Sequence, residues 1–277
     1  MNGIAYGMIL FLIASGFSLI FGVMRILNLA HGSLYMLGAY FGLTIAKVSN
    51  SFLLGVLAAI IGIGVVGLLL QRAFLERLYK QIPEQVLLTL GLVYIFSNLA
   101  LWIWGPFAKV GTAPGFTAGS INLGGIFFSV YRIALIFVGL AVALCLYLFQ
   151  EKTWYGAVIR AGMHDKEMII ALGINYRLIS NLVFILGSMM VGAAGFLGSP
   201  ILGAHPWMSF EVLLLALAVI VIGGFGYVQG ALMGAIVIGL IDSFGKVFFS
   251  DFALFTIYLA MIIILLIRPA GLLGKTR

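Results

Sequence analysis

The sequence predicts an all-α protein, a polytopic transmembrane helical bundle. Hydrophobic residues make up 64% of the chain, charged residues 8%, and the mean hydropathy is +1.23. A soluble domain of this size carries about a quarter charged residues. The 277 residues can hold roughly eight or nine spans of about 20 residues with short loops. We therefore treat 1–277 as a single transmembrane domain, with no room for a soluble catalytic domain.

Nine apolar runs separated by short polar or glycine-rich stretches predict the membrane segments. They are 3–24, 26–46, 52–70, 86–104, 131–149, 179–198, 212–222, 228–245 and 252–267. The first run has neither a basic segment before it nor a polar cleavage stretch after it, which indicates a first span rather than a signal peptide.

The basic residues predict the orientation. With the N-terminus outside, one set of loops carries eleven basic residues: Arg25, Arg72, Arg77, Lys80, Lys152, Arg160, Lys166, Arg177, Arg268, Lys275 and Arg277. The opposite loops carry four: Lys47, Lys109, Arg132 and Lys246. Because cytoplasmic loops are enriched in Lys and Arg, the pattern predicts an N-out, C-in protein. Such loop bias also explains the net charge of +7 without nucleic acid as a partner.

Two segments depart from simple spans and are candidates for broken or re-entrant hairpins. Residues 3–46 turn with almost no polar linker, and 212–245 is too long for one crossing and short for two. Broken helices in corresponding halves indicate a transport site near the midplane. The candidate translocation path therefore takes in Asn28, His31, Gly32, Gly223, Gly224, Gly226 and Gln229. Tight interfacial turns are the alternative.

Two polar residues of the first break allow a structural and a functional interpretation. A histidine or asparagine within an apolar segment is costly in lipid and suggests function. The ring of His31 could instead bond a backbone carbonyl and fix the turn, and the same choice holds for Asn28. Glu211 and Asp242 stand at run edges, where an interfacial position is favoured over a proton relay.

A polar segment, about 150–178, lies on the predicted cytoplasmic side. Asp165 is placed to cap a short helix from Lys166 to Leu172, Glu167 suits its dipole, and Gly173 can end it in the left-handed conformation. An exposed apolar face then needs a partner or the lipid surface. That face is predicted to comprise Met168, Ile169, Ala171 and Leu172.

The sequence contains no recognisable set of catalytic residues. Its three histidines lie in unrelated regions, and no HExxH, GxSxG or CxxC motif occurs. The ending PAGLLGKT only mimics a phosphate-binding loop, because Pro269 replaces the first glycine. The single cysteine, Cys145, excludes an internal disulfide and a cysteine metal cluster. We expect neither a catalytic nor a metal site, and no cofactor in this chain.

Four stretches carry a resemblance to a known family: 16–40 with NLAHG, 153–197, 221–239 and 267–275 with RPAGLLGK. Together they resemble the branched-chain amino acid ABC transporter permeases, on the side of the H-type (LivH-like) subunit. The resemblance covers nearly the whole chain.

The resemblance implies an ATP-driven importer in a bacterial or archaeal cytoplasmic membrane. It implies a second, LivM-like permease subunit, two ATPase subunits (LivG- and LivF-like) that bind ATP and magnesium, and an extracytoplasmic solute-binding protein. Glu167, Ala171 and Gly173 match the coupling loop to the ATPase, with Arg160 and Asp165 beside them. The substrates implied are leucine, isoleucine, valine or related small amino acids.

Three alternatives remain open. Permeases for urea or short amides look similar within the same family. A stand-alone secondary carrier or channel would need ion-coupling carboxylates within the spans, but the eight acidic residues lie mostly in loops or at edges. A membrane enzyme lacks its catalytic residues.

Overall fold

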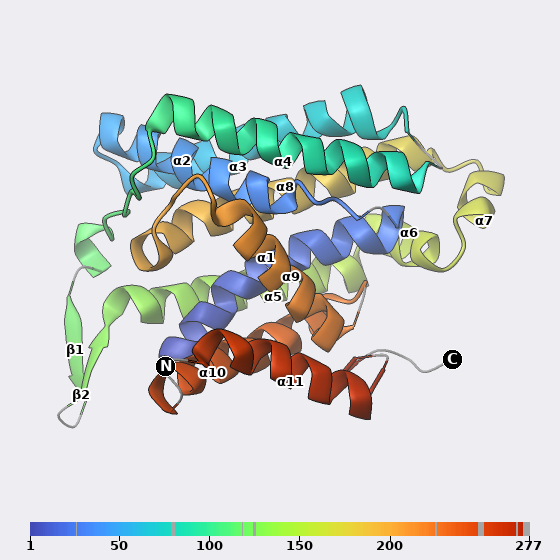
Figure 1. Ribbon diagram of the computed structural model, residues 1–277. Helices are drawn as coiled ribbons and strands as arrows, with labels where there is room; N and C mark the ends of the chain where they lie inside the picture. Colours follow the sequence, from blue (N-terminus) through green and yellow to red (C-terminus); the bar gives the residue numbers. More distant parts are fainter. Residues whose placement is uncertain are drawn as a thin grey trace.

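A computed structural model describes residues 1–25, 27–78, 81–117, 119–123, 126–224, 226–248, 252–269 and 271–273. Its helices (Figure 1) are α1 Asn2–Met24, α2 His31–Ser49, α3 Phe52–Leu70, α4 Ile82–Trp104, α5 Val130–Lys152, α6 Trp154–His164, α7 Lys166–Ala171, α8 Tyr176–Leu202, α9 Met208–Gly223, α10 Val228–Phe248 and α11 Ala253–Ile267. A π-helical turn, Gln71–Leu75, extends α3. The 3-10 turn Gly115–Thr117 precedes the antiparallel strands β1 Ser120–Leu123 and β2 Ile126–Ser129.

Each predicted apolar run corresponds to one helix. Among the described residues, six helices are long and apolar enough to cross a membrane, namely α1, α3, α4, α5, α8 and α10. Residues 208–223 and 255–267 form shorter apolar helices, and the 19-residue α2 accounts for the remaining run. The helical membrane architecture is thus confirmed.

The two ends of the bundle differ. Figure 1 places the N-terminus and the β1–β2 pair at one end, and α6 and α7 at the opposite end. No membrane segment is predicted over 105–130, the stretch between the apolar runs 86–104 and 131–149. Part of it instead forms this pair, in which Ser120 aligns with Ser129 and Leu123 with Ile126.

Helix α1 forms the centre of the molecule. Its most apolar stretch is 89% buried, whereas the corresponding stretches of α4 and α5 are 28% buried. It packs against α10, α8 and α5, and α8 in turn packs against α2 and α3. Within the predicted first hairpin, 3–46, α8 packs against both arms, α1 and α2.

Glycines allow these helices to approach closely, as the small-residue spacing predicted. A Cβ at Gly16 of α1 would lie 2.5 Å from the carbonyl oxygen of Gly187 of α8. One at Gly38 of α2 would lie 2.5 Å from Gly192. Backbone contact of this kind gives helices in lipid the dispersion energy that the hydrophobic effect does not supply there.

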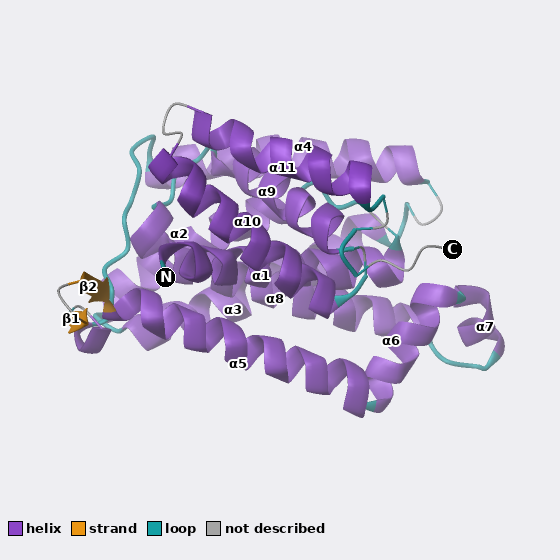
Figure 2. Cartoon of the chain, turned by 90° about the horizontal axis from the view of Figure 1, so that it is seen from below, coloured by secondary structure: helices purple, strands orange, loops and turns teal. Residues whose placement is uncertain are grey.

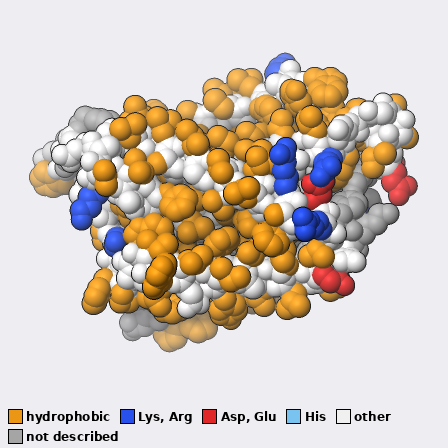
Figure 3. All heavy atoms as spheres, turned by 90° about the horizontal axis from the view of Figure 1, so that it is seen from above, with side chains coloured by type: hydrophobic (Ala, Val, Ile, Leu, Met, Phe, Trp, Pro, Cys, Tyr) orange, Lys and Arg blue, Asp and Glu red, His pale blue; other side chains and the backbone are white. Residues whose placement is uncertain are grey.

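The outer helices expose apolar side chains. Leu57 and Ile61 of α3, Phe137 of α5 and Leu259 of α11 are all more than 40% exposed. Hydrophobic spheres cover the middle of the face seen in Figure 3, and charged side chains gather towards the two ends. Such a band suits the hydrocarbon core of a bilayer.

Candidate functional site

The polar segment folds into two short helices at one end of the bundle (Figure 2). Thr153 caps α6, its Oγ1 accepting a bond of 3.0 Å from the amide of Gly156. Asp165 caps α7 as predicted, its Oδ1 accepting from the amide of Met168 at 3.1 Å. Gly173 follows with φ of 76°, the predicted left-handed residue. The helix ends at Ala171, one residue earlier than expected.

The exposed apolar face of α7 differs from the prediction in one residue. Met168, Ile170 and Leu172 are 59%, 52% and 68% exposed, and Ala171 is exposed. Ile169 is only 2% exposed because it turns towards α6, where its Cδ1 would lie 3.0 Å from a Cβ at Gly162. Including Ile169 in the exposed face was wrong: contact with a second short helix reorients α7.

Ionic contacts join the polar segment to the helices around it. Arg160 pairs with Glu151 at 3.5 Å, and Arg177 pairs with Glu76, just beyond α3. Nη2 of Arg25 donates to the carbonyl of Met163 at 3.3 Å. Glu167 is exposed.

The first break, between α1 and α2, is closed by side chains. Oδ1 of Asn28 accepts from the amide of Ala30 at 3.1 Å. Nε2 of His31 lies 3.0 Å from the carbonyl oxygen of Ile13, and the ring meets Phe17 edge-on at 5.2 Å between centroids. This is the structural interpretation that the sequence left open, with a carbonyl on α1 as the acceptor.

The second break, between α9 and α10, is built from backbone. Gly224 and Gly226 have φ of 104° and 84°, which glycine adopts without strain. A Cβ at Gly223 would overlap the carbonyl of Gly230. The amide of Gly226 donates to Oγ of Ser18 at 3.1 Å, and the amide of Leu272 donates to the carbonyl of Ile222 at 2.7 Å.

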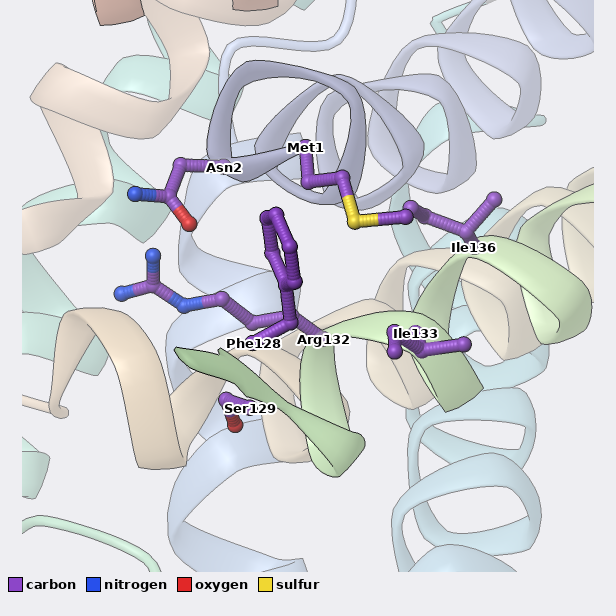
Figure 4. A pocket seen from close by; sticks show the side chains of 7 residues that line it. All are labelled: Met1, Asn2, Phe128, Ser129, Arg132, Ile133 and Ile136. Carbon is purple, nitrogen blue, oxygen red and sulfur yellow. The ribbon is translucent and has the colours of Figure 1, made fainter. Parts of the chain in front are cut away.

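Most residues of the predicted path are buried in helix contacts. Asn28 and His31 are 1% and 0% exposed, and Gly32, Gly223, Gly224 and Gly226 are buried, while Gln229 is exposed. Both breaks contact α1. Nε2 of His31 lies beside the carbonyl oxygen of Ile13, and the amide of Gly226 donates to Ser18. A small pocket lies at the far end of α1, between Met1, Asn2 and Arg132 (Figure 4).

Sequence reasoning missed the contacts of Met163 and Arg25. Neither residue has an unusual type or spacing, and their partners lie far away in the chain. The one available signal was Arg25 itself, a lone charge directly after an apolar run.

A comparison with known families decides the class. Residues 1–267 match the family described as "Branched-chain amino acid transport system / permease component". The chain belongs to this family. The permease is thus a multi-pass membrane protein, a transport component and not an enzyme.

Named relatives agree with this assignment. The permease is 28% identical to the high-affinity branched-chain amino acid transport system permease protein BraD of Pseudomonas aeruginosa, covering 99% of this chain and 94% of that protein. It is 25% identical to LivH of Escherichia coli K12, covering 99% and 94%. An archaeal relative, the probable LivH of Methanocaldococcus jannaschii, is 26% identical over 99% of this chain and 91% of its own length.

A solved structure shares the fold. PsaBC from Streptococcus pneumoniae, in complex with Fab, superposes with a TM-score of 0.52 at 12% identity. The match covers 96% of this chain and 89% of that chain.

Proposed function

We propose that this permease imports branched-chain amino acids by alternating access, driven by separate ATPase subunits. The observation that carries the proposal is the α6–α7 segment: a capped helix pair at one end of a membrane bundle, with apolar side chains uncovered. A soluble subunit that covers Met168, Ile170 and Leu172 would bury apolar surface that otherwise faces water. Glu167, Ala171 and Gly173 belong to this docking surface.

The orientation proposed is N-out, C-in. Arg160 is part of α6, and Arg25 donates to the carbonyl of Met163 in the same helix, while Arg132 lies at the start of α5, directly after β2. The basic excess at the α6–α7 end supports a cytoplasmic location for it. ATPases would dock there, and a solute-binding protein would meet the opposite end.

A second permease subunit is proposed to cover one face of α4. Gly91, Tyr94 and Asn98 follow one another at helical spacing on its exposed side, and Tyr94 is 59% exposed. Polar side chains in mid-span are unfavourable against lipid. A Cβ at Gly91 would meet no atom within 4 Å, so a neighbouring helix could approach closely here.

Reconstitution tests the proposal. The chain, tagged and purified in mild detergent with its co-purifying subunits, is placed in proteoliposomes with ATP and labelled leucine. We expect co-purified ATPases and ATP-dependent leucine uptake that unlabelled isoleucine and valine, but not urea, compete away. Recovery of this chain alone, with uptake independent of ATP, would favour a stand-alone carrier or channel.

Gly173→Val sharpens the same test. No atom lies within 4 Å of a Cβ there, so only the left-handed φ of 76° opposes the substitution, at a cost of roughly 1–2 kcal/mol. We expect normal amounts in the membrane but weakened ATPase docking and lost uptake. Normal uptake by this variant would remove the coupling role of the α7 cap.

A further inference from the structure

Met163, near the end of α6, occupies a cradle formed by two glycines from distant parts of the chain. A Cβ at Gly22 of α1 would lie 2.7 Å from the Sδ of Met163, and a Cβ at Gly226 would lie 3.3 Å from it. The same Cβ at Gly22 would lie 3.1 Å from the Cα of Gly226. Three segments thus meet at one sulfur atom.

Hydrogen bonds tie the same three segments together. Arg25, one turn beyond Gly22, donates to the carbonyl of Met163 at 3.3 Å. The amide of Gly226 donates to Oγ of Ser18 at 3.1 Å. The polar segment, the end of α1 and the 224–227 turn are therefore fixed to one another by side-chain packing and by hydrogen bonds.

We infer that Met163 is a positioning residue of transport: it carries displacements of α6 and α7 to the end of α1 and to the 224–227 turn. Close-packed contacts transmit displacement because no void absorbs it. α1 is the central helix and touches both breaks, so a shift of its end alters both at once. This inference rests on the proposed function, because it needs an ATPase that moves α6–α7.

The test compares two methionine deletions in the reconstituted complex. Met163→Ala empties the cradle. Met189→Ala is the matched control, because Met189 of α8 fills a similar groove, with its Cγ 2.8 Å from a Cβ at Gly64 of α3, inside the bundle. The readout is the number of ATP molecules hydrolysed per leucine imported.

We expect Met163→Ala to raise this ratio about fivefold or more, a change typical of a lost coupling energy, while ATP hydrolysis continues. Met163→Leu, which restores most of the volume, should return the ratio to that of the unaltered complex, and Met189→Ala should leave it unchanged. An unchanged ratio in Met163→Ala overturns the inference, as does an equal rise in both alanine variants. If the unaltered complex shows no ATP-dependent uptake, the proposed function itself fails.

A disulfide tests the link in a second way. Gly22→Cys and Met163→Cys are combined in a Cys145→Ser background and oxidised. Because the inference makes the two segments move as one unit, the cross-linked complex should keep ATP-driven uptake after oxidation. Reduction frees two side chains that no longer fill the cradle, so it should raise the number of ATP molecules hydrolysed per leucine imported, as in Met163→Ala. Uptake that is abolished by the cross-link and restored by reductant would show that the segments separate during transport, and would overturn the inference.

Discussion

The chain interrupts its membrane helices at 25–30 and again at 224–227, and the two interruptions are stabilised differently. At the first, the side chains of Asn28 and His31 bond backbone groups at 3.1 and 3.0 Å. At the second, Gly224 and Gly226 turn the backbone itself, and the amide of Leu272 binds the carbonyl of Ile222. A break closed by side chains can lose one bond and persist, whereas in the break made of glycine backbone a Cβ added at Gly223 would overlap the carbonyl of Gly230.

Gly223→Val, in the second break, is expected to destabilise the protein more than any substitution in the first break. The added side chain would overlap the carbonyl of Gly230, and relief requires moving α9 from α10. We expect a loss of about 3 kcal/mol or more, at the upper end of overpacking costs, seen as little extractable, monodisperse protein. Gly115→Val in the stretch before β1, where a Cβ meets no atom within 4 Å, is the matched control and should be recovered in near-normal amounts. Equal recovery of the two variants would contradict a tightly packed second break.

His31→Ala tests the first break. It removes the bond to the Ile13 carbonyl and the edge contact with Phe17, for which we expect about 2 kcal/mol of lost stability in detergent unfolding. His205→Ala is the control: that side chain is 31% exposed and lies 3.8 Å from Glu211, so its loss should cost less than about 0.5 kcal/mol. If uptake per folded molecule falls with unchanged stability, His31 lines the path instead of fixing the turn.

The smallest effect is expected for Gly226→Ala. An alanine at φ of 84° costs roughly 1–2 kcal/mol in strain. Gly105→Ala, at φ of 83° with no neighbour within 4 Å, is the comparison variant, and a larger loss of unfolding free energy at Gly226 reports the contacts of the added Cβ with Met163 and Gly22. A smaller loss at Gly226 than at Gly105 would show that no such contact exists.

The sequence predicted those features that are set locally. Runs of about 20 apolar residues identify spans because lipid leaves the backbone only internal partners, and each run became a helix. Asp165 and Gly173 were predictable because a cap and a left-handed stop depend on neighbours within four residues. The predicted exposure of Ile169 was wrong because its burial depends on α6, a helix that the sequence analysis did not separate from the rest of the polar segment.

Contacts between segments far apart in the chain could not be predicted from the sequence. The packing of α8 against both α1 and α2 depends on which glycines face each other. Nothing in the sequence around Gly16 and Gly187 indicates that these two glycines are in contact. The cradle around Met163 joins three segments in the same way. The β1–β2 pair was missed because its strands have only four residues each and lie in a stretch rich in glycine, proline and threonine.

The amides of Leu272 and Leu273 bind the carbonyls of Ile222 and Gly223 at 2.7 and 3.2 Å. Helix α9 therefore relies for its final carbonyls on residues that the ribosome makes only after α10 and α11. Until those residues emerge, the end of α9 lacks these partners and must be satisfied by water or by the insertion machinery. Assembly of this turn is consequently a late event in biosynthesis, and a chain stalled before residue 271 should carry an open α9 end that quality control can recognise.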